Sequence, residues 1–226
     1  FNILCGIKRL DKITSVSYSV LSEIYSEFKI MSYPKYNQVL YNSIPLNVQN
    51  EKINFSKLLI DSNEKYIYTI SGIAPHKNLN FLIDAFEEFQ KIYPDYKLII
   101  SGVDKNRYLC ENSNVIFTPF LSEEEKIFLI KNAQLFVFPS LVEGFGIPLI
   151  EGLYHNQNVL VSDIPIFREI GKEYVSYFDP YDKDFLINYF KSEKKSINHE
   201  EAKQYILETF EAKKSAQKLE EIFNEY

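Results

Sequence analysis

Residues 135–154 read LFVFPSLVEGFGIPLIEGLY, an apolar run followed by a glycine-rich turn and a second apolar stretch. The run at 135–138 is uninterrupted, which is expected of a central parallel strand that is covered on both faces. Two glycines mark the turn, and Pro148 stands in the first turn of a helix that we predict to begin near residue 147, where its missing N–H costs nothing. The stretch predicts a strand, a loop and a helix in that order.

Strand and helix signals alternate on both sides of this stretch from residue 66 onward. That alternation predicts an α/β fold with a Rossmann-like, doubly wound parallel sheet. The stretch from residue 184 to the end has helical periodicity alone, with breaks near 194–197 and at Phe210, and predicts extra C-terminal helices. Besides 135–138, strands are predicted at 66–71, 97–101, 115–118, 158–162 and 175–178. Ser122 and Glu125 predict a capping box for a helix that runs to about residue 132.

The predicted organisation has two parts. Residues 1–50 form the tail of a preceding domain together with a linker, and residues 51–226 form the Rossmann-like domain with its C-terminal helices. The elements predicted in the first part could not form a core of their own. The chain begins at Phe1, and its opening resembles the middle of a domain, so we expect it to belong to a longer chain. The first part is predicted to contain a strand at 11–17, a helix at 18–28, a strand at 38–41 and a polar linker at 47–57.

Composition excludes several functions. Of the 226 residues, 46% are hydrophobic and 25% charged, as in ordered globular proteins. A formal net charge of -6 argues against binding to nucleic acid, since neutralising phosphates needs a clustered Lys/Arg surface. Cys5 and Cys110 are too few and too far apart to predict a disulfide framework or a cysteine zinc site. No apolar run approaches the roughly 18 residues of a membrane span, and we expect a cytoplasmic protein.

The turn at 143–151 is the first candidate site. Its backbone amides follow the carboxyl end of a predicted strand and precede a helix, a place that favours anions. Glu143 and Glu151 flank the turn and could point into one crevice, where a carboxylate is suited to binding vicinal hydroxyls. Two glutamates at this spacing are usually solvated surface, but the apolar strand and the Gly-Phe-Gly sequence favour a binding role here.

The loop after the first predicted strand of the sheet is the second candidate site. Residues 71–78 read SGIAPHKN and open the next helix. Lys77 stands where a cation could meet a diphosphate at the carboxyl edge of the sheet. In isolation, a loop lysine such as Lys77 or a loop histidine such as His76 is usually only solvated.

Together these segments resemble a known family. The run from Glu143 to Glu151 resembles the E-x7-E motif of retaining glycosyltransferases of family GT4, which have the GT-B fold. Residues 13–20, 40–45, 75–79 and 210–226 resemble further segments of that family in the same order, so the likeness covers essentially the whole chain. The chain resembles the C-terminal, donor-binding domain of such an enzyme, preceded by the tail of its acceptor domain.

The resemblance implies a role for each site residue. Glu143 would contact hydroxyls of the donor sugar, Glu151 would bind the ribose, and Lys77 would neutralise the departing diphosphate. The amides of the turn would hold the sugar and the diphosphate. The implied catalytic residues are Glu143 and Lys77, and the implied donor-binding residues are Gly72, His76, Lys77, Gly144, Phe145, Gly146, Ile147 and Glu151.

The activity implied by the resemblance is retaining transfer of a hexose from a UDP-sugar or a GDP-sugar to a glycan or lipid-linked sugar acceptor, in the synthesis of bacterial cell-surface polysaccharide. No metal or other cofactor is expected. The sequence at 182–184 spells the D-x-D metal motif of a different glycosyltransferase fold, but Asp182 precedes an apolar periodic stretch and is interpreted as a helix cap. The resemblance also allows peripheral membrane association of the full-length enzyme through its N-terminal domain.

Departures from the family pattern leave alternatives open. Many members have Gly-Arg where this chain has Ser71-Gly72, which removes one phosphate cation. His76 could replace that cation, and donor binding would then weaken as the imidazole loses its proton. The chain could also be a non-catalytic nucleotide-sugar-binding module or a subunit that needs a separate acceptor-domain partner. A GT-B relative with epimerase or phosphorylase chemistry is the least favoured alternative, since no lysine lies in a setting that suggests a pyridoxal Schiff base.

Overall fold

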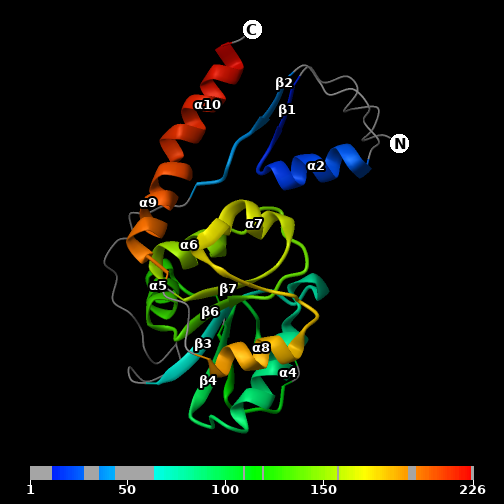
Figure 1. Ribbon diagram of the computed structural model, residues 1–226, viewed down its shortest axis with the longest axis vertical. Helices are drawn as coiled ribbons and strands as arrows, with labels where there is room; N and C mark the ends of the chain where they lie inside the picture. Colours follow the sequence, from blue (N-terminus) through cyan, green and yellow to red (C-terminus); the bar gives the residue numbers. More distant parts are fainter. Residues whose placement is uncertain are drawn as a thin grey trace.

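The computed structural model describes residues 12–27, 36–43, 64–108, 110–118, 120–156, 158–192 and 197–224. Its main body is a six-stranded sheet with helices on both faces, and a small N-terminal part lies beyond helix α7 (Figure 1). The predicted α/β fold with a Rossmann-like, doubly wound parallel sheet is confirmed.

All neighbouring strands of the six-stranded sheet are parallel, in the order β5-β4-β3-β6-β7-β8. The chain runs outward from β3 in one direction, crosses back, and runs outward from β6 in the other direction. The point of reversal between β3 and β6 is where open α/β sheets bind ligands, at the carboxyl ends of the strands. The strands are β3 (Lys65–Ile70), β4 (Tyr96–Ser101), β5 (Val115–Thr118), β6 (Leu135–Phe138), β7 (Val159–Ser162) and β8 (Ser176–Phe178).

Helices cover the sheet on two sides (Figure 1). Helices α4 (Leu79–Gln90) and α8 (Lys183–Lys191) pack together on one face, where they contact the core that contains Leu135 and Val137. The other face carries the core that contains Phe136 and Phe138, because successive strand residues point to opposite faces. It is covered by α5 (Glu123–Asn132), α6 (Ile147–His155), α7 (Pro165–Gly171) and α9 (His199–Thr209).

Two helix starts confirm predictions from the sequence. Ser122 and Glu125 form the predicted capping box at the start of α5. Asp182 caps α8, because its Oδ1 accepts a hydrogen bond from the amide of Phe185 at 2.9 Å. The predicted break at Phe210 separates α9 from α10 (Ala212–Asn224).

The N-terminal part contains a parallel pair, β1 (Lys12–Ser15) and β2 (Tyr36–Val39), and helix α2 (Tyr18–Glu27). Strand β1 is shorter than predicted because Ser17 already belongs to the helix start, where its Oγ accepts a hydrogen bond from the amide of Val20 at 3.1 Å. Strand β2 lies two residues earlier than predicted. The predicted linker and the predicted boundary near residue 50 lie outside the described residues, so the division into two parts stays a prediction.

The buried apolar residues of this part form a small cluster of their own, Ile13, Leu21, Tyr25 and Val39. Residues 1–11, 28–35 and 44–50 lie outside the described residues, so the expectation that these elements do not form an independent core stays a prediction. Glu169 of α7 joins α2 to the main body, since its carboxylate accepts hydrogen bonds from the amides of Tyr18 and Ser19, both at 2.8 Å. Ser215 of α10 donates a hydrogen bond to the carbonyl of Tyr41 at 2.8 Å.

Candidate functional site

The two loops singled out in the sequence meet at the carboxyl ends of β3 and β6. These strands are neighbours in the sheet. The amide of Leu141, in the loop after β6, donates a hydrogen bond at 2.7 Å to the carbonyl of His76, in the loop after β3. Residues 71–78 and 139–146 therefore lie side by side at the point where the strand order reverses.

Lys77 and Glu143 form an ion pair between these loops. Lys77 ends a short 3-10 turn (Pro75–Lys77), and its Nζ lies 2.5 Å from Oε1 of Glu143. The two side chains are 22% and 12% exposed, and the ammonium lies 5.6 Å from the centre of the Phe138 ring. Partial burial strengthens such a pair because less water screens it. The structure thus brings the two predicted catalytic residues together.

The turn that follows Glu143 is shaped by glycine and held by an aromatic ring. Gly146 precedes α6 with φ +94°, and a Cβ added there would lie 3.0 Å from the ring of Phe167. The ring of Phe145 is buried against Tyr41 and Phe210, with ring centroids 5.9 Å away in each case. Phe145 therefore anchors the turn, and its amide is the group left for a ligand.

The backbone N–H groups of this turn have no hydrogen-bond acceptor among the described residues. None of the described residues accepts a hydrogen bond from the backbone N–H of Gly144, Phe145 or Gly146. A Cβ added at Gly144 would meet no atom within 4 Å, so the backbone faces open space there. Unpaired amides at a helix N-terminus favour an anion.

Four buried hydroxyls that have no hydrogen-bond partner among the described residues lie at or near the carboxyl ends of strands in this sheet. Such groups usually bond to protein, ordered water or a ligand. A Ser or Thr at or near the carboxyl end of an apolar strand is the sequence signal for such hydroxyls, and these residues are not among the predicted site residues. They belong to Thr69 near the end of β3, Thr118 at the end of β5, Ser140 after β6 and Ser162 at the end of β7.

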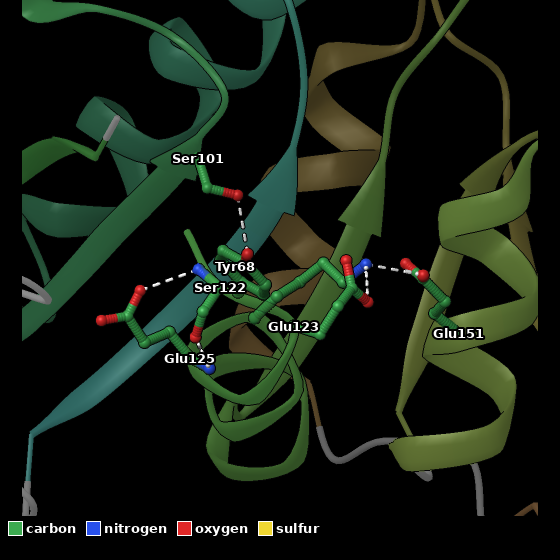
Figure 2. A network of polar contacts seen from close by, with 7 residues as sticks. Tyr68, Ser101, Ser122, Glu123, Glu125 and Glu151 are labelled. Atoms are coloured by element: carbon green, nitrogen blue, oxygen red, sulfur yellow. Dashed lines mark hydrogen bonds and ion pairs between the residues drawn. The ribbon is translucent and has the colours of Figure 1, made fainter. Parts of the chain in front are cut away.

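Glu151 lies on α6 and has a partner of its own. Its Oε1 lies 2.7 Å from Nζ of Lys126 on α5, and that nitrogen also lies 2.7 Å from Oε2 of Glu123. Figure 2 shows the carboxylates of Glu123 and Glu151 on either side of this ammonium group. Lys126 was missed in the sequence because its spacing from Glu123 is that of an ordinary surface pair on a helix.

Burial sets the electrostatics of this second pair. It raises the pKa of the Glu151 carboxyl, and the hydrogen bond from Lys126 opposes that change. Burial acts to lower the pKa of Lys126, but its bonds to Glu123 and Glu151 outweigh burial, and the pKa lies above its ordinary value. Lys126 remains charged because it is shared by two carboxylates.

Three other predicted donor-binding residues lie in the loop after β3 or at the start of α6. His76 has an exposed side chain, and its backbone carbonyl joins the two loops. A Cβ added at Gly72 would meet no atom within 4 Å, and Ile147, the first residue of α6, is 41% exposed. Their roles in binding stay predictions.

A cavity of about 240 Å³ lies at the opposite edge of the sheet, where the strands have their amino ends. Its lining includes Tyr93 and Phe190, together with Gln134 and Asn158, which precede β6 and β7. We do not assign the site to this cavity, because ligands of open α/β sheets bind at the carboxyl ends of the strands.

In the part of the chain that the structure describes, no cluster of three or more metal-binding side chains is found. The helices described are all too short or too polar to cross a membrane.

Comparison of the sequence with known families gives one match that covers most of the chain. The family model of glycosyl transferases group 1 matches residues 50–221. The serotype-specific mannosyltransferase WbdA of Escherichia coli is 31% identical over 200 residues, covering 80% of this chain and 24% of WbdA. The O-antigen chain mannosyltransferase RfbU of Salmonella typhimurium is 31% identical over 193 residues, covering 81% of this chain and 51% of RfbU.

Comparison of the structure with solved structures gives the same fold. The crystal structure of TarM matches with a TM-score of 0.72 and 16% sequence identity, covering 99% of this chain and 45% of that chain. At this identity the likeness is one of fold alone. The chain spans about half the length of RfbU and about a quarter of the length of WbdA.

Proposed function

Because the chain belongs to the family of glycosyl transferases group 1, we propose that it forms the donor-binding part of a glycosyltransferase. The reaction is transfer of a hexose, with retention, from a UDP-sugar or a GDP-sugar to a glycan or lipid-linked sugar acceptor. The similarity to RfbU, an O-antigen chain mannosyltransferase, supports a role in cell-surface polysaccharide synthesis and mannose as a candidate hexose. The proposal includes a cytoplasmic location and no metal cofactor.

The observation that supports this function best is the Lys77–Glu143 pair at the reversal point of the sheet. Beside it, the unpaired amides of the turn and the N-terminus of α6 form a place for the donor diphosphate. A cation and fixed amide dipoles in one crevice can stabilise the negative charge that develops when a nucleoside diphosphate leaves.

Each side chain has one task in the proposed reaction. Lys77 binds the diphosphate and stabilises it as the bond to the sugar breaks. Glu143 accepts hydrogen bonds from hydroxyls of the donor sugar and so orients the anomeric carbon. Glu151 accepts hydrogen bonds from the ribose hydroxyls, a task for which an ionised carboxylate is suited.

The alternative of a non-catalytic binding module shares this site. In both cases the donor binds at the loops after β3 and β6. The alternative differs only in whether transfer follows, and a transfer assay separates the two.

Calorimetric titration tests the proposed site. We expect the chain to bind UDP or GDP, or one of their sugar conjugates, weakly but measurably. Lys77→Ala should weaken diphosphate binding, whereas Lys105→Ala, which removes an exposed lysine from the loop after the neighbouring strand β4, should not. Absence of heat with every ligand, using folded protein, would reject the proposed function.

A further inference from the structure

The surroundings of Glu151 disfavour its negative charge, although its proposed task of binding the ribose hydroxyls requires an ionised carboxylate. Its side chain is 10% exposed and lies between α5 and α6. An ionised carboxylate is purely an acceptor and binds both hydroxyls of a vicinal diol through strong, charge-assisted hydrogen bonds, whereas a protonated one carries a donor on one oxygen and forms weaker bonds. Burial favours the protonated form. A compensating positive charge beside Glu151 would keep it ready to bind.

Lys126 supplies that charge from α5. Its Nζ lies 2.7 Å from Oε1 of Glu151 and 2.7 Å from Oε2 of Glu123, and its side chain is 18% exposed (Figure 2). The capping box of Ser122 and Glu125 fixes the first turn of α5, from which Lys126 extends. The ammonium group is thus held from two sides on a helix whose start is itself fixed.

The other titratable groups around Glu151 do not favour its charge. Glu123 of α5 raises the pKa of Glu151 by repulsion. Tyr68 of β3 is buried and bonded to Ser101 at 2.7 Å, and burial raises the pKa of its hydroxyl, so it stays neutral. His155, one turn further along α6, is also neutral near pH 7, since burial lowers its pKa to about 4. Among the groups described around Glu151, Lys126 is the cation.

The contact leaves room for a ligand. The hydrogen bond from Lys126 goes to Oε1 of Glu151. An ionised carboxylate has about four acceptor positions on its two oxygens, so the ammonium and a diol can be held at the same time. Lys126 therefore does not have to leave when a nucleotide binds.

We propose that Lys126 is a positioning residue of the donor site, which keeps Glu151 ionised and oriented for the ribose diol. This inference rests on the proposed function, because it assigns a task to a residue that acts through Glu151. Lys126 itself contacts no part of the donor.

The test compares ribonucleotides with their 2′-deoxy counterparts at two pH values. Kd is measured by calorimetry for UDP, 2′-deoxy-UDP, GDP and 2′-deoxy-GDP at about pH 8.5 and about pH 6, because the ionised fraction of a buried, unpaired carboxyl falls as the pH is lowered across this interval. The quantity followed is the preference for the ribonucleotide, the ratio of the two Kd values. Titration of the diphosphate affects both ligands alike and cancels in that ratio.

The parent chain should prefer the ribonucleotide by about tenfold or more at both pH values, as expected for a hydrogen bond to a charged group. In Lys126→Met the carboxyl of Glu151 loses its cation, so its pKa rises further. Diol recognition is then present above that pKa and lost as the pH falls through it. We expect Lys126→Met to keep most of the preference at the higher pH and to lose at least about threefold of it at the lower pH.

Three variants complete the test. Lys126→Arg keeps the charge and should restore the parental preference at both pH values. Lys131→Met makes the same substitution at an exposed position of the same helix and should behave as the parent. Lys126→Gln keeps a hydrogen-bond donor without the charge, so it serves in place of Lys126→Met if that variant does not fold, with the same expected result.

The outcomes separate the two proposals. A parent chain that binds neither nucleotide, or binds ribonucleotide and 2′-deoxynucleotide equally, overturns the assignment of Glu151 in the proposed function. A parent chain that prefers the ribonucleotide, together with a charge-free Lys126 variant whose preference matches the parent at both pH values, overturns the positioning role alone.

Discussion

At the scale of single residues, the Lys77 ammonium supplies a positive charge at the carboxyl ends of β3 and β6. Its Nζ lies 2.5 Å from Oε1 of Glu143 and over the ring of Phe138. The pair is partly buried, so its charges are screened less than those of an exposed pair. Oxygens of a bound diphosphate could share the hydrogens of this ammonium, most strongly when negative charge develops on them. In the proposed function the second pair, Lys126–Glu151, serves to bind the ribose.

The two pairs predict different effects of substitution. Glu151→Ala should weaken binding of nucleosides, nucleoside monophosphates and nucleoside diphosphates alike, because all contain the ribose. Lys77→Ala should weaken binding mainly of the diphosphates. Each lost charge-assisted hydrogen bond is expected to cost about 1.5–3 kcal/mol. Calorimetry with UMP, UDP, GMP and GDP gives the comparison, and variants that both bind UDP and GDP as the parent does would show that the site is wrongly assigned.

The sequence predicted the individual residues of the site better than their contacts. Lys77 and Glu143 were each found from a loop after an apolar strand, but their ion pair depends on β3 and β6 being neighbours, which local patterns do not specify. Lys126 was missed for a similar reason. Its spacing from Glu123 accounts for it as a surface pair, and its contact with Glu151 exists only because α5 packs beside α6.

At the scale of elements, the packing of α6 against α9 places His155 in a partly buried position. Burial lowers its pKa from 6.5 to about 4, and the positive charge of Lys131 acts in the same direction. Between these two pKa values the unfolded chain binds a proton at this residue and the folded chain does not. Stability therefore rises with pH across this window and is lost as the pH falls from 6.5 toward 4.

This gives a prediction for His155→Gln, which cannot be protonated. As the pH falls from 6.5 to about 4.5, the free energy of unfolding should decrease by about 1–2 kcal/mol more for the parent than for the variant. This figure is reduced because the ring is partly exposed to solvent, which screens charge. Urea unfolding of both proteins at several pH values measures this difference. The two proteins have the same carboxylates, so the effect of carboxylate protonation on stability cancels when they are compared. Parallel curves for the two proteins would show that His155 is not held in its neutral form.

The attachment of α2 to α7 depends on one carboxylate. Glu169 accepts hydrogen bonds from the amides of Tyr18 and Ser19, and also from Ser19 Oγ at 2.7 Å and the Tyr41 hydroxyl at 3.0 Å. These are the first amides of α2, where a negative charge is favourable. The contact joins residues about 150 positions apart.

Glu169→Gln should loosen this attachment, because one carboxylate oxygen becomes an NH₂ group that faces a donor. We expect amide exchange in Tyr18–Glu27 to become faster by about tenfold or more, which corresponds to the loss of about 1.5 kcal/mol or more. Hydrogen exchange followed by mass spectrometry measures it, with Glu173→Gln at a nearby exposed position as the control. Equal exchange in α2 for all three proteins would refute the role of Glu169.

Elements were predictable where several signals in the sequence agreed. Strand β6 has an uninterrupted apolar run, and α5 has a capping box and lies where predicted. The N-terminal elements were less well placed, and β2 lies two residues from its predicted position. Its stability comes from pairing with β1, which is a contact between separate segments and leaves little local pattern.

At the scale of the whole molecule, the proposed site is one wall of a crevice. The described residues contain one Rossmann-like domain and a small N-terminal part, which lies beside α10 in Figure 1. Retaining transfer needs the acceptor oxygen at about 3–3.5 Å from the anomeric carbon, and such positioning can account for about 7–11 kcal/mol of the barrier. In the proposed function the described residues bind the donor, and they include no opposing domain for the acceptor.

The 226-residue chain on its own is therefore expected to bind donor without transferring sugar. The assay incubates it with UDP-sugars and GDP-sugars and with free or lipid-linked sugar acceptors, alone and then with an acceptor-domain partner added. Turnover should not exceed background hydrolysis for the chain alone. Transfer by the chain alone would refute this expectation, and failure with every partner would favour the non-catalytic binding module.

A crystal structure of the chain with UDP or GDP bound tests the location of the donor site most directly. The account predicts diphosphate oxygens within hydrogen-bond distance of Nζ of Lys77 and of the amides of Gly144 to Gly146, with the ribose hydroxyls on Glu151. A nucleotide bound instead at the opposite edge of the sheet, in the cavity lined by Tyr93 and Phe190, would contradict it.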